Sequence, residues 1–183
     1  MVRKILLGIG ILILLAVVVV FASVAYNGSL EPPQLETNFV DLDTVRRISK
    51  FRSCAGHTAT PQHGQEPKRS MKHYFTLYPE YEKENFVEIY APYDGYIALF
   101  AGPEEIWFAP GEKSVFSILP MNRWMFSVTH VKAREDLNMG DYVKAGEVIG
   151  YGTFSPKYER GYPSFDVVYG KLGSLLKMKK VDN

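Results

Sequence analysis

The sequence predicts a mainly β protein, a barrel-like sandwich of short strands preceded by one N-terminal transmembrane helix. Two segments with glycine corners and one long apolar run support this prediction. The segments read I-Y-A-P-Y-D-G-Y-I at residues 89–97 and G-D-Y-V-K-A-G-E-V-I-G at residues 140–150. Brief apolar stretches that alternate with turn residues are typical of short strands joined by tight corners, where glycine supplies a positive φ.

The apolar run covers residues 5–26, contains no charged residue and is rich in Ile, Leu, Val and Ala. As a helix with a rise of about 1.5 Å per residue it would be about 33 Å long, enough to cross a hydrocarbon core of about 30 Å. Arg3 and Lys4 precede the run, and Glu31 and Glu36 follow it. The positive-inside rule therefore predicts a cytoplasmic N-terminus and an extracytoplasmic remainder.

A cleaved signal peptide is the alternative to a retained anchor. Ser23 and Ala25 are small residues that would suit a cleavage site. The apolar run is longer than the usual signal core of about 7–15 residues. A retained, single-pass anchor is therefore the favoured interpretation.

Four parts are predicted along the chain: a membrane anchor or signal peptide at residues 1–26, a stalk at 27–37, a short helix and loop at 38–70, and a β domain at 71–183. Glycine and two prolines indicate the stalk, because proline cannot continue a helix. Apolar residues at helical spacing predict a short amphipathic helix within residues 38–51. They are Val40, Leu42, Val45 and Ile48.

The glycine corners belong to a longer order of motifs. The first corner is followed by an isolated His130 after an apolar run, then by the second corner and by F-D-V-V at residues 165–168. This order resembles the lysostaphin-type (LytM-type) zinc endopeptidases of the cell wall, over residues 71–169. The resemblance implies the duplicated hybrid motif, a fold that lipoyl, biotinyl and sugar-phosphotransferase carrier domains share. Fold alone does not carry activity, so each site position needs its own match.

The resemblance also implies a zinc site that this chain matches only in part. The family's first ligand is a His followed four residues later by Asp; His73 is the best match, but Leu77 stands at the second position. The last ligand, the second His of a His-x-His, is replaced by Asp166. His130 matches a catalytic histidine. The metal ligands implied are therefore His73 and Asp166, and the site is expected to be degenerate.

A catalytic zinc takes three protein ligands and leaves a fourth position for water. His57 and His63 are the candidates for the third ligand, in a stretch rich in Gly, Pro, Ser and Thr that is typical of a loop. No cofactor is expected, and zinc is expected only if such a loop residue completes the site. A ligand-binding groove is assigned to Trp107, Trp124 and Ser164, with core or edge packing as the alternative for the two aromatic rings.

These observations predict a membrane-anchored, extracytoplasmic, lysostaphin-like domain that binds or scaffolds in the cell envelope without catalysis. The alternative is a zinc-dependent metallopeptidase acting on cell-wall peptide, with His130 as its catalytic histidine. The expected partners are the membrane and a cell-wall polymer or envelope protein. Nucleic acid is excluded, because the formal net charge is only +1. The single cysteine, Cys54, rules out an intramolecular disulfide.

Overall fold

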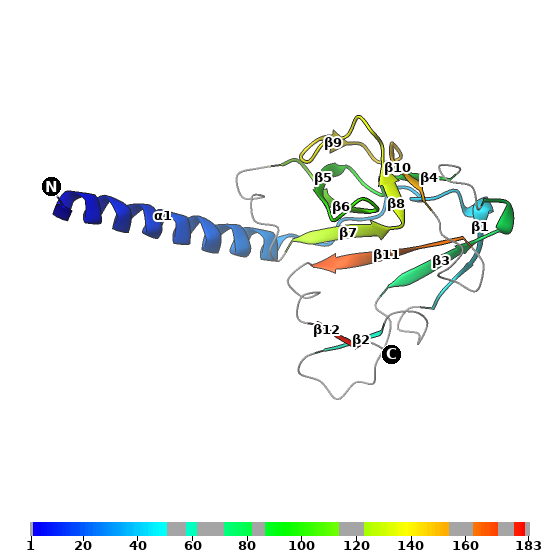
Figure 1. Ribbon diagram of the computed structural model, residues 1–183, viewed down its shortest axis with the longest axis horizontal. Coiled ribbons are helices and arrows are strands. Elements are labelled where there is room, and N and C mark those ends of the chain that lie inside the picture. Colours follow the sequence, from blue (N-terminus) through cyan, green and yellow to red (C-terminus); the bar gives the residue numbers. More distant parts are fainter. Residues whose placement is uncertain are drawn as a thin grey trace.

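The computed structural model describes residues 2–50, 58–61, 72–81, 87–113, 123–153, 163–171 and 178–181. It confirms the predicted class: a mainly β fold preceded by one N-terminal apolar helix (Figure 1). This helix, α1, spans Val2–Ser29 and projects away from the β structure. It is long and apolar enough to cross a membrane, as a signal sequence would also be.

The larger sheet has seven strands, all paired antiparallel. In spatial order they are β1 (Val45–Ile48), β3 (His73–Leu77), β11 (Ser164–Lys171), β7 (Trp124–Thr129), β6 (Glu105–Pro110), β5 (Gly95–Phe100) and β9 (Tyr142–Val143). The smaller sheet has the order β4 (Glu88–Tyr90), β10 (Val148–Gly152) and β8 (Val131–Ala133). A separate ribbon pairs β2 (Thr58–Pro61) with β12 (Met178–Val181). Two 3-10 turns, η1 (Leu42–Thr44) and η2 (Pro79–Tyr81), also lie in the described part of the chain.

One apolar cluster, built from strands of both main sheets, forms the core. Because side chains alternate along a strand, β11 turns Phe165 and Val167 inward, while Asp166 faces the other side of the sheet. The rings of Phe75 and Phe165 stack with centroids 4.9 Å apart. The outer face of β7 and β11 carries Ser127, Thr129 and Asp166 beside Met125 of a smaller apolar cluster, and the candidate site lies at its polar end.

The two glycine corners require glycine for different reasons. Gly146 has a φ of +81°, as expected for a tight corner. The expectation of a positive φ at Gly95 is wrong, because Gly95 is not among the residues with positive φ. A Cβ at Gly95 would instead lie 2.2 Å from the carbonyl oxygen of Ala109 on the neighbouring strand β6. Space, not backbone conformation, excludes a side chain there.

Asp94 joins the two corners. Its Oδ1 accepts a hydrogen bond from the Ala145 backbone N–H at 2.8 Å, and its Oδ2 accepts one from the Tyr142 hydroxyl at 2.9 Å. Both hydrogen bonds lower the pKa of the Asp94 carboxyl, and the bond from the Ala145 N–H has the larger effect. The two motifs that are about 50 residues apart in sequence thus meet through one carboxylate.

The amphipathic helix predicted within residues 38–51 is not formed. Val40 bridges to Ile89, η1 follows, and β1 pairs with β3 at the edge of the large sheet. Val40 is fully buried, whereas the side chains of Leu42 and Ile48 are half exposed. The four apolar residues at helical spacing therefore do not form one buried face of a helix.

The predicted stalk is also different in the structure. Helix α1 continues to Ser29, beyond the expected boundary. The chain after it then lies along the large sheet, where the Tyr169 hydroxyl donates to the Pro33 carbonyl at 2.7 Å. Farther on, the backbone N–H of Glu36 donates to the Pro92 carbonyl at 2.8 Å. Residues 27–37 thus pack on the β structure instead of forming a free spacer.

Candidate functional site

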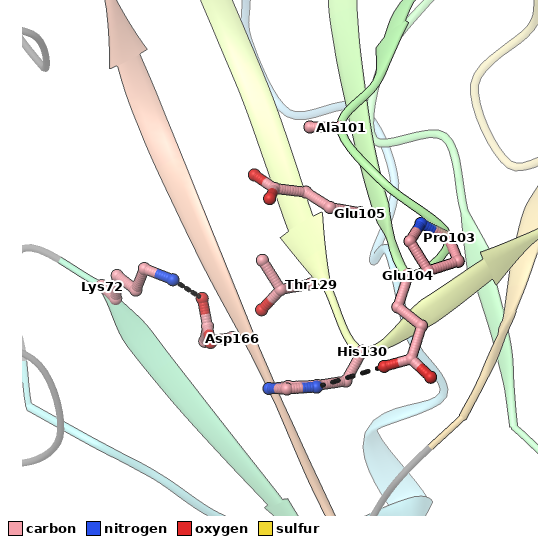
Figure 2. A pocket seen from close by; sticks show the side chains of 8 residues that line it. All are labelled: Lys72, Ala101, Pro103, Glu104, Glu105, Thr129, His130 and Asp166. Carbon is pink, nitrogen blue, oxygen red and sulfur yellow. Dashed lines mark ion pairs between the residues drawn. The ribbon is translucent and has the colours of Figure 1, made fainter.

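A pocket of about 360 Å³ opens on the outer face of the large sheet, beside the end of β7 (Figure 2). Its walls come from the segment before β3, the connection between β5 and β6, the end of β7, and β11. The lining residues are Lys72, Ala101, Pro103, Glu104, Glu105, Thr129, His130 and Asp166. Three carboxylates, one ammonium and one imidazole therefore surround the same space.

Asp166 lies at the base of the pocket. Sheet register places it opposite Thr129 of β7 and Tyr74 of β3. The residue is only 4% exposed, and the Lys72 Nζ lies 2.6 Å from its Oδ1. A buried carboxylate needs a partner of opposite charge, and the ammonium group of Lys72 is that partner.

His130 sits at the corner between β7 and β8 with a φ of 62°. A non-glycine residue in this left-handed region is uncommon, although His is enriched among those that adopt it. The corner is fixed by the Thr153 backbone N–H, which donates to the His130 carbonyl at 2.9 Å. The imidazole Nδ1 then lies 3.7 Å from Oε2 of Glu104. Strain of this kind persists only where neighbouring structure enforces it, so the fold imposes this position on the imidazole.

Glu105 is the second acidic wall of the pocket. Its Oε1 accepts hydrogen bonds from the Trp107 indole N–H at 2.5 Å and from the Ser127 hydroxyl at 3.0 Å. Both donors lie on the outer face of the large sheet, on β6 and β7. Glu105 is therefore held in place as an acceptor, while the carboxylate of Glu104 is half exposed.

The structure brings His130 and Asp166 together but leaves His73 elsewhere. His73 pairs with Val167, whereas its neighbour Tyr74 pairs with Asp166. Because side chains alternate along a strand, the side chain of His73 lies on the other face of the sheet from that of Asp166. Its Nδ1 lies 3.3 Å from the Ser49 carbonyl oxygen. Leu77, at the position where the family has Asp, is fully buried in the core. Lys72, one residue before His73, reaches the pocket instead.

The three groove residues do not line this pocket. Trp107 acts on the pocket indirectly, because its indole N–H donates a hydrogen bond to the lining residue Glu105. Ser164 is buried in β11 opposite Thr76. Trp124 is at the far end of β7, where its indole N–H donates to the Leu30 carbonyl at 3.0 Å.

The described residues do not bring the expected zinc ligands together in this pocket. Among the residues that the structure describes, no three His, Cys, Asp or Glu side chains are arranged to hold a metal. Asp166, the one expected ligand in the pocket, is already paired with an ammonium group. His57 and His63, the candidates for a third ligand, lie outside the described residues.

Three pocket residues were missed by sequence reasoning: Lys72, Glu104 and Glu105. Lys72 adjoins His73, and neighbouring residues of an extended segment face opposite sides, so a motif match to His73 does not identify Lys72. The two glutamates follow Gly102 and Pro103 in a turn between β5 and β6. Adjacent acidic residues after a Gly-Pro turn are common on surfaces, so only the fold distinguishes these two.

Comparison with solved structures gives loose structural likenesses. The deep-sea M23 metalloprotease pseudoalterin superposes with a TM-score of 0.41 and 14% identity, covering 72% of this chain and 72% of that chain. No family model matches the sequence. No curated protein matches it either. With so loose an overlap, function has to be argued from the pocket itself.

Proposed function

We propose that this protein is a membrane-anchored, extracytoplasmic binding or scaffolding module of the cell envelope that does not catalyse a reaction. The observation that carries the proposal is the ion pair between Lys72 and the buried Asp166. A zinc centre needs its ligands free of other cations. An ammonium group at 2.6 Å stabilises the carboxylate in the way a metal would.

The rest of the pocket is suited to recognition. Glu105 is fixed by two hydrogen bonds, and His130 offers an imidazole next to Glu104. Fixed acceptors around a concave space provide orientation and specificity for a polar ligand. A cell-wall polymer or an envelope protein is the expected class of partner.

Metal content tests the non-catalytic assignment. Full-length protein, purified in detergent and dialysed, is expected to retain far less than one zinc per chain. Asp166→Ala should not change this content, nor should Asp136→Ala, which removes an exposed carboxylate paired with Arg134 at a separate site. Stoichiometric zinc that is lost in Asp166→Ala and in His57→Ala or His63→Ala, but kept in Asp136→Ala, would establish the alternative: a zinc metallopeptidase with His130 as its catalytic histidine.

Topology tests the membrane assignment. The apolar helix α1, with Arg3 and Lys4 before it, supports a cytoplasmic N-terminus. A reporter that works only outside the cytoplasm should therefore be active when fused after Asn183. Activity of a cytoplasmic reporter at the same position would refute this orientation. A mature protein that starts near Tyr26 would replace the anchor by a cleaved signal peptide.

A further inference from the structure

The outer end of α1 is attached to the β structure through a set of contacts that we call the junction. The junction comprises Ser23, Asn27, Gly28, Leu30 and Pro33 on the helix side, and Arg123, Trp124, Tyr169 and Lys171 on the sheet side. The sheet residues lie at the start of β7 and the end of β11, which are neighbours in the large sheet. Figure 1 shows both strands at the foot of α1.

One face of the last helical turns is covered. Ser23 and Asn27 are four residues apart, so they share a face of the helix, and both are fully buried. Nη1 of Arg123 donates to Oδ1 of Asn27 at 3.3 Å. Nη2 of Arg123 donates to the Pro110 carbonyl at 2.6 Å, and the guanidinium lies 5.2 Å from the ring centroid of Tyr96. Arg123 is 3% exposed, so it links helix and sheet from the interior.

The carbonyl groups at the helix end also receive donors from the sheet. Nζ of Lys171 donates to the Gly28 carbonyl at 2.8 Å, and the Trp124 indole N–H donates to the Leu30 carbonyl. A cation at this position also favours the negative end of the helix dipole. Tyr169 stacks on Trp124 at 5.4 Å. Burial raises the pKa of Tyr169 to about 12, so its hydroxyl remains a donor to Pro33 at neutral pH.

The length of the uncovered helix matches a bilayer. Every residue from 3 to 21 is exposed, and the covered face begins with Ser23. At about 1.5 Å per residue, the uncharged exposed residues 5–21 extend about 26 Å, close to the roughly 30 Å of the hydrocarbon core, with Arg3 and Lys4 at its cytoplasmic edge. If α1 spans the membrane, the β structure therefore begins where the hydrocarbon ends.

We propose that the junction seats the β domain directly on the outer leaflet, with Trp124, Tyr169 and Lys171 at the level of the lipid headgroups. This inference rests on the membrane-spanning role proposed above for α1. Tryptophan, tyrosine and basic side chains are favoured at that level of a bilayer. The exposed Tyr26 extends the same aromatic belt from the helix side.

The junction also fixes where the pocket stands. β7 runs from Trp124 at the junction to Thr129 at the pocket, and β11 runs back from Asp166 to Lys171. Five strand residues span about 17 Å. The pocket is thus held roughly 17 Å beyond the headgroup level, and its ligand must be presented close to the membrane surface.

The two tryptophans of the chain allow a direct test. Trp107→Phe leaves only Trp124, at the junction, and Trp124→Tyr leaves only Trp107, which pairs with Ser127 about 10 Å farther along the sheet. Full-length single-tryptophan proteins are reconstituted into phosphatidylcholine vesicles with or without lipids brominated near the headgroup. Fluorescence of Trp124 should be quenched severalfold more strongly than that of Trp107.

Two further arms separate the possible failures. A flexible Gly-Ser insertion between Ser29 and Leu30, combined with Asn27→Ala and Lys171→Ala so that the contacts before the insertion are also lost, should reduce quenching of Trp124 to the level of Trp107 in the Trp107→Phe background. Equal, weak quenching of both tryptophans in protein that floats with the vesicles would overturn the seating but leave the anchor intact. Protein that does not float, with a mass showing loss of α1, would overturn the anchor and the seating together. Quenching unchanged by the insertion would also overturn the role of the junction.

Discussion

Gly95 and Gly102 require glycine for two different reasons, lack of space for a Cβ and a positive φ. At Gly95 a Cβ would meet the Ala109 carbonyl at 2.2 Å and the Phe108 ring at 2.9 Å. At Gly102 the surroundings are open, but φ is +89°. Gly95→Ala should lower the free energy of unfolding by about 3 kcal/mol or more, because β5 and β6 must move apart. Gly102→Ala should cost about 1–2 kcal/mol from backbone strain alone. Chemical denaturation measures both, and equal losses would contradict the steric account of Gly95.

The backbone conformation that places the His130 imidazole in the pocket also lowers the stability of the fold. Its φ of 62° is unfavourable for any residue with a Cβ, so His130→Gly should be more stable than His130→Ala by about 1 kcal/mol. Both variants remove the imidazole from the pocket and should weaken ligand binding alike. Unfolding midpoints in denaturant would show the difference. A His130→Ala protein at least as stable as His130→Gly would mean that the corner does not keep its left-handed conformation.

The carboxylate of Asp94 connects the segment before β5 to the segment at Tyr142 and Ala145. The pKa of Asp94 is lower in the folded state, so its stabilising effect is present above the unfolded pKa of about 3.9 and is lost as pH falls through the folded pKa. Asp94→Asn keeps an acceptor for the Ala145 N–H but does not ionise. Wild type should therefore be more stable than Asp94→Asn at neutral pH, and this advantage should disappear once the pH falls below the lowered pKa of the folded state. A difference that does not change with pH would show that the charge of Asp94 is not involved.

At the level of elements, the sequence predicted what local patterns can encode. The corner at Gly146, the mainly β class and the apolar helix all depend on short-range signals, and the structure has them. Gly95 instead begins strand β5 without a positive φ. The segment around Val45 was predicted as a helix, because a four-residue edge strand is too short to show an alternating pattern. Its conformation comes from pairing with β3, which lies about 30 residues farther along the chain.

The pocket was half predictable for the same reason. Asp166 and His130 could be found because each has a recognisable motif around it. Lys72 had no such motif, and its place in the pocket depends on the pairing of β3 with β11, which sets the face on which each residue of this segment lies. The attachment of Trp124 to Leu30 joins segments 94 residues apart and leaves no local signal.

At the scale of the whole molecule, anchor and pocket lie at opposite ends of the same two strands. β7 and β11 pair over six positions from Asp166–Thr129 to Lys171–Trp124, so the route from junction to pocket is one continuous ladder of hydrogen bonds. A continuous sheet is stiffer than a linker rich in glycine and proline. The orientation of the pocket relative to the helix is therefore set by the sheet.

Asn27 distinguishes an attached domain from one on a free stalk. Asn27→Ala removes the acceptor that faces Nη1 of the buried Arg123, and an unsatisfied buried donor costs about 1–3 kcal/mol. Gln34→Ala, seven residues later on an exposed part of the same segment, should change the free energy of unfolding by less than about 0.5 kcal/mol. Both variants would be unfolded as full-length chains in the same detergent, with the fluorescence of Trp124 as the signal. If Asn27→Ala were as stable as Gln34→Ala, the helix end would not be held by the sheet, and residues 27–37 would act as the stalk predicted from the sequence.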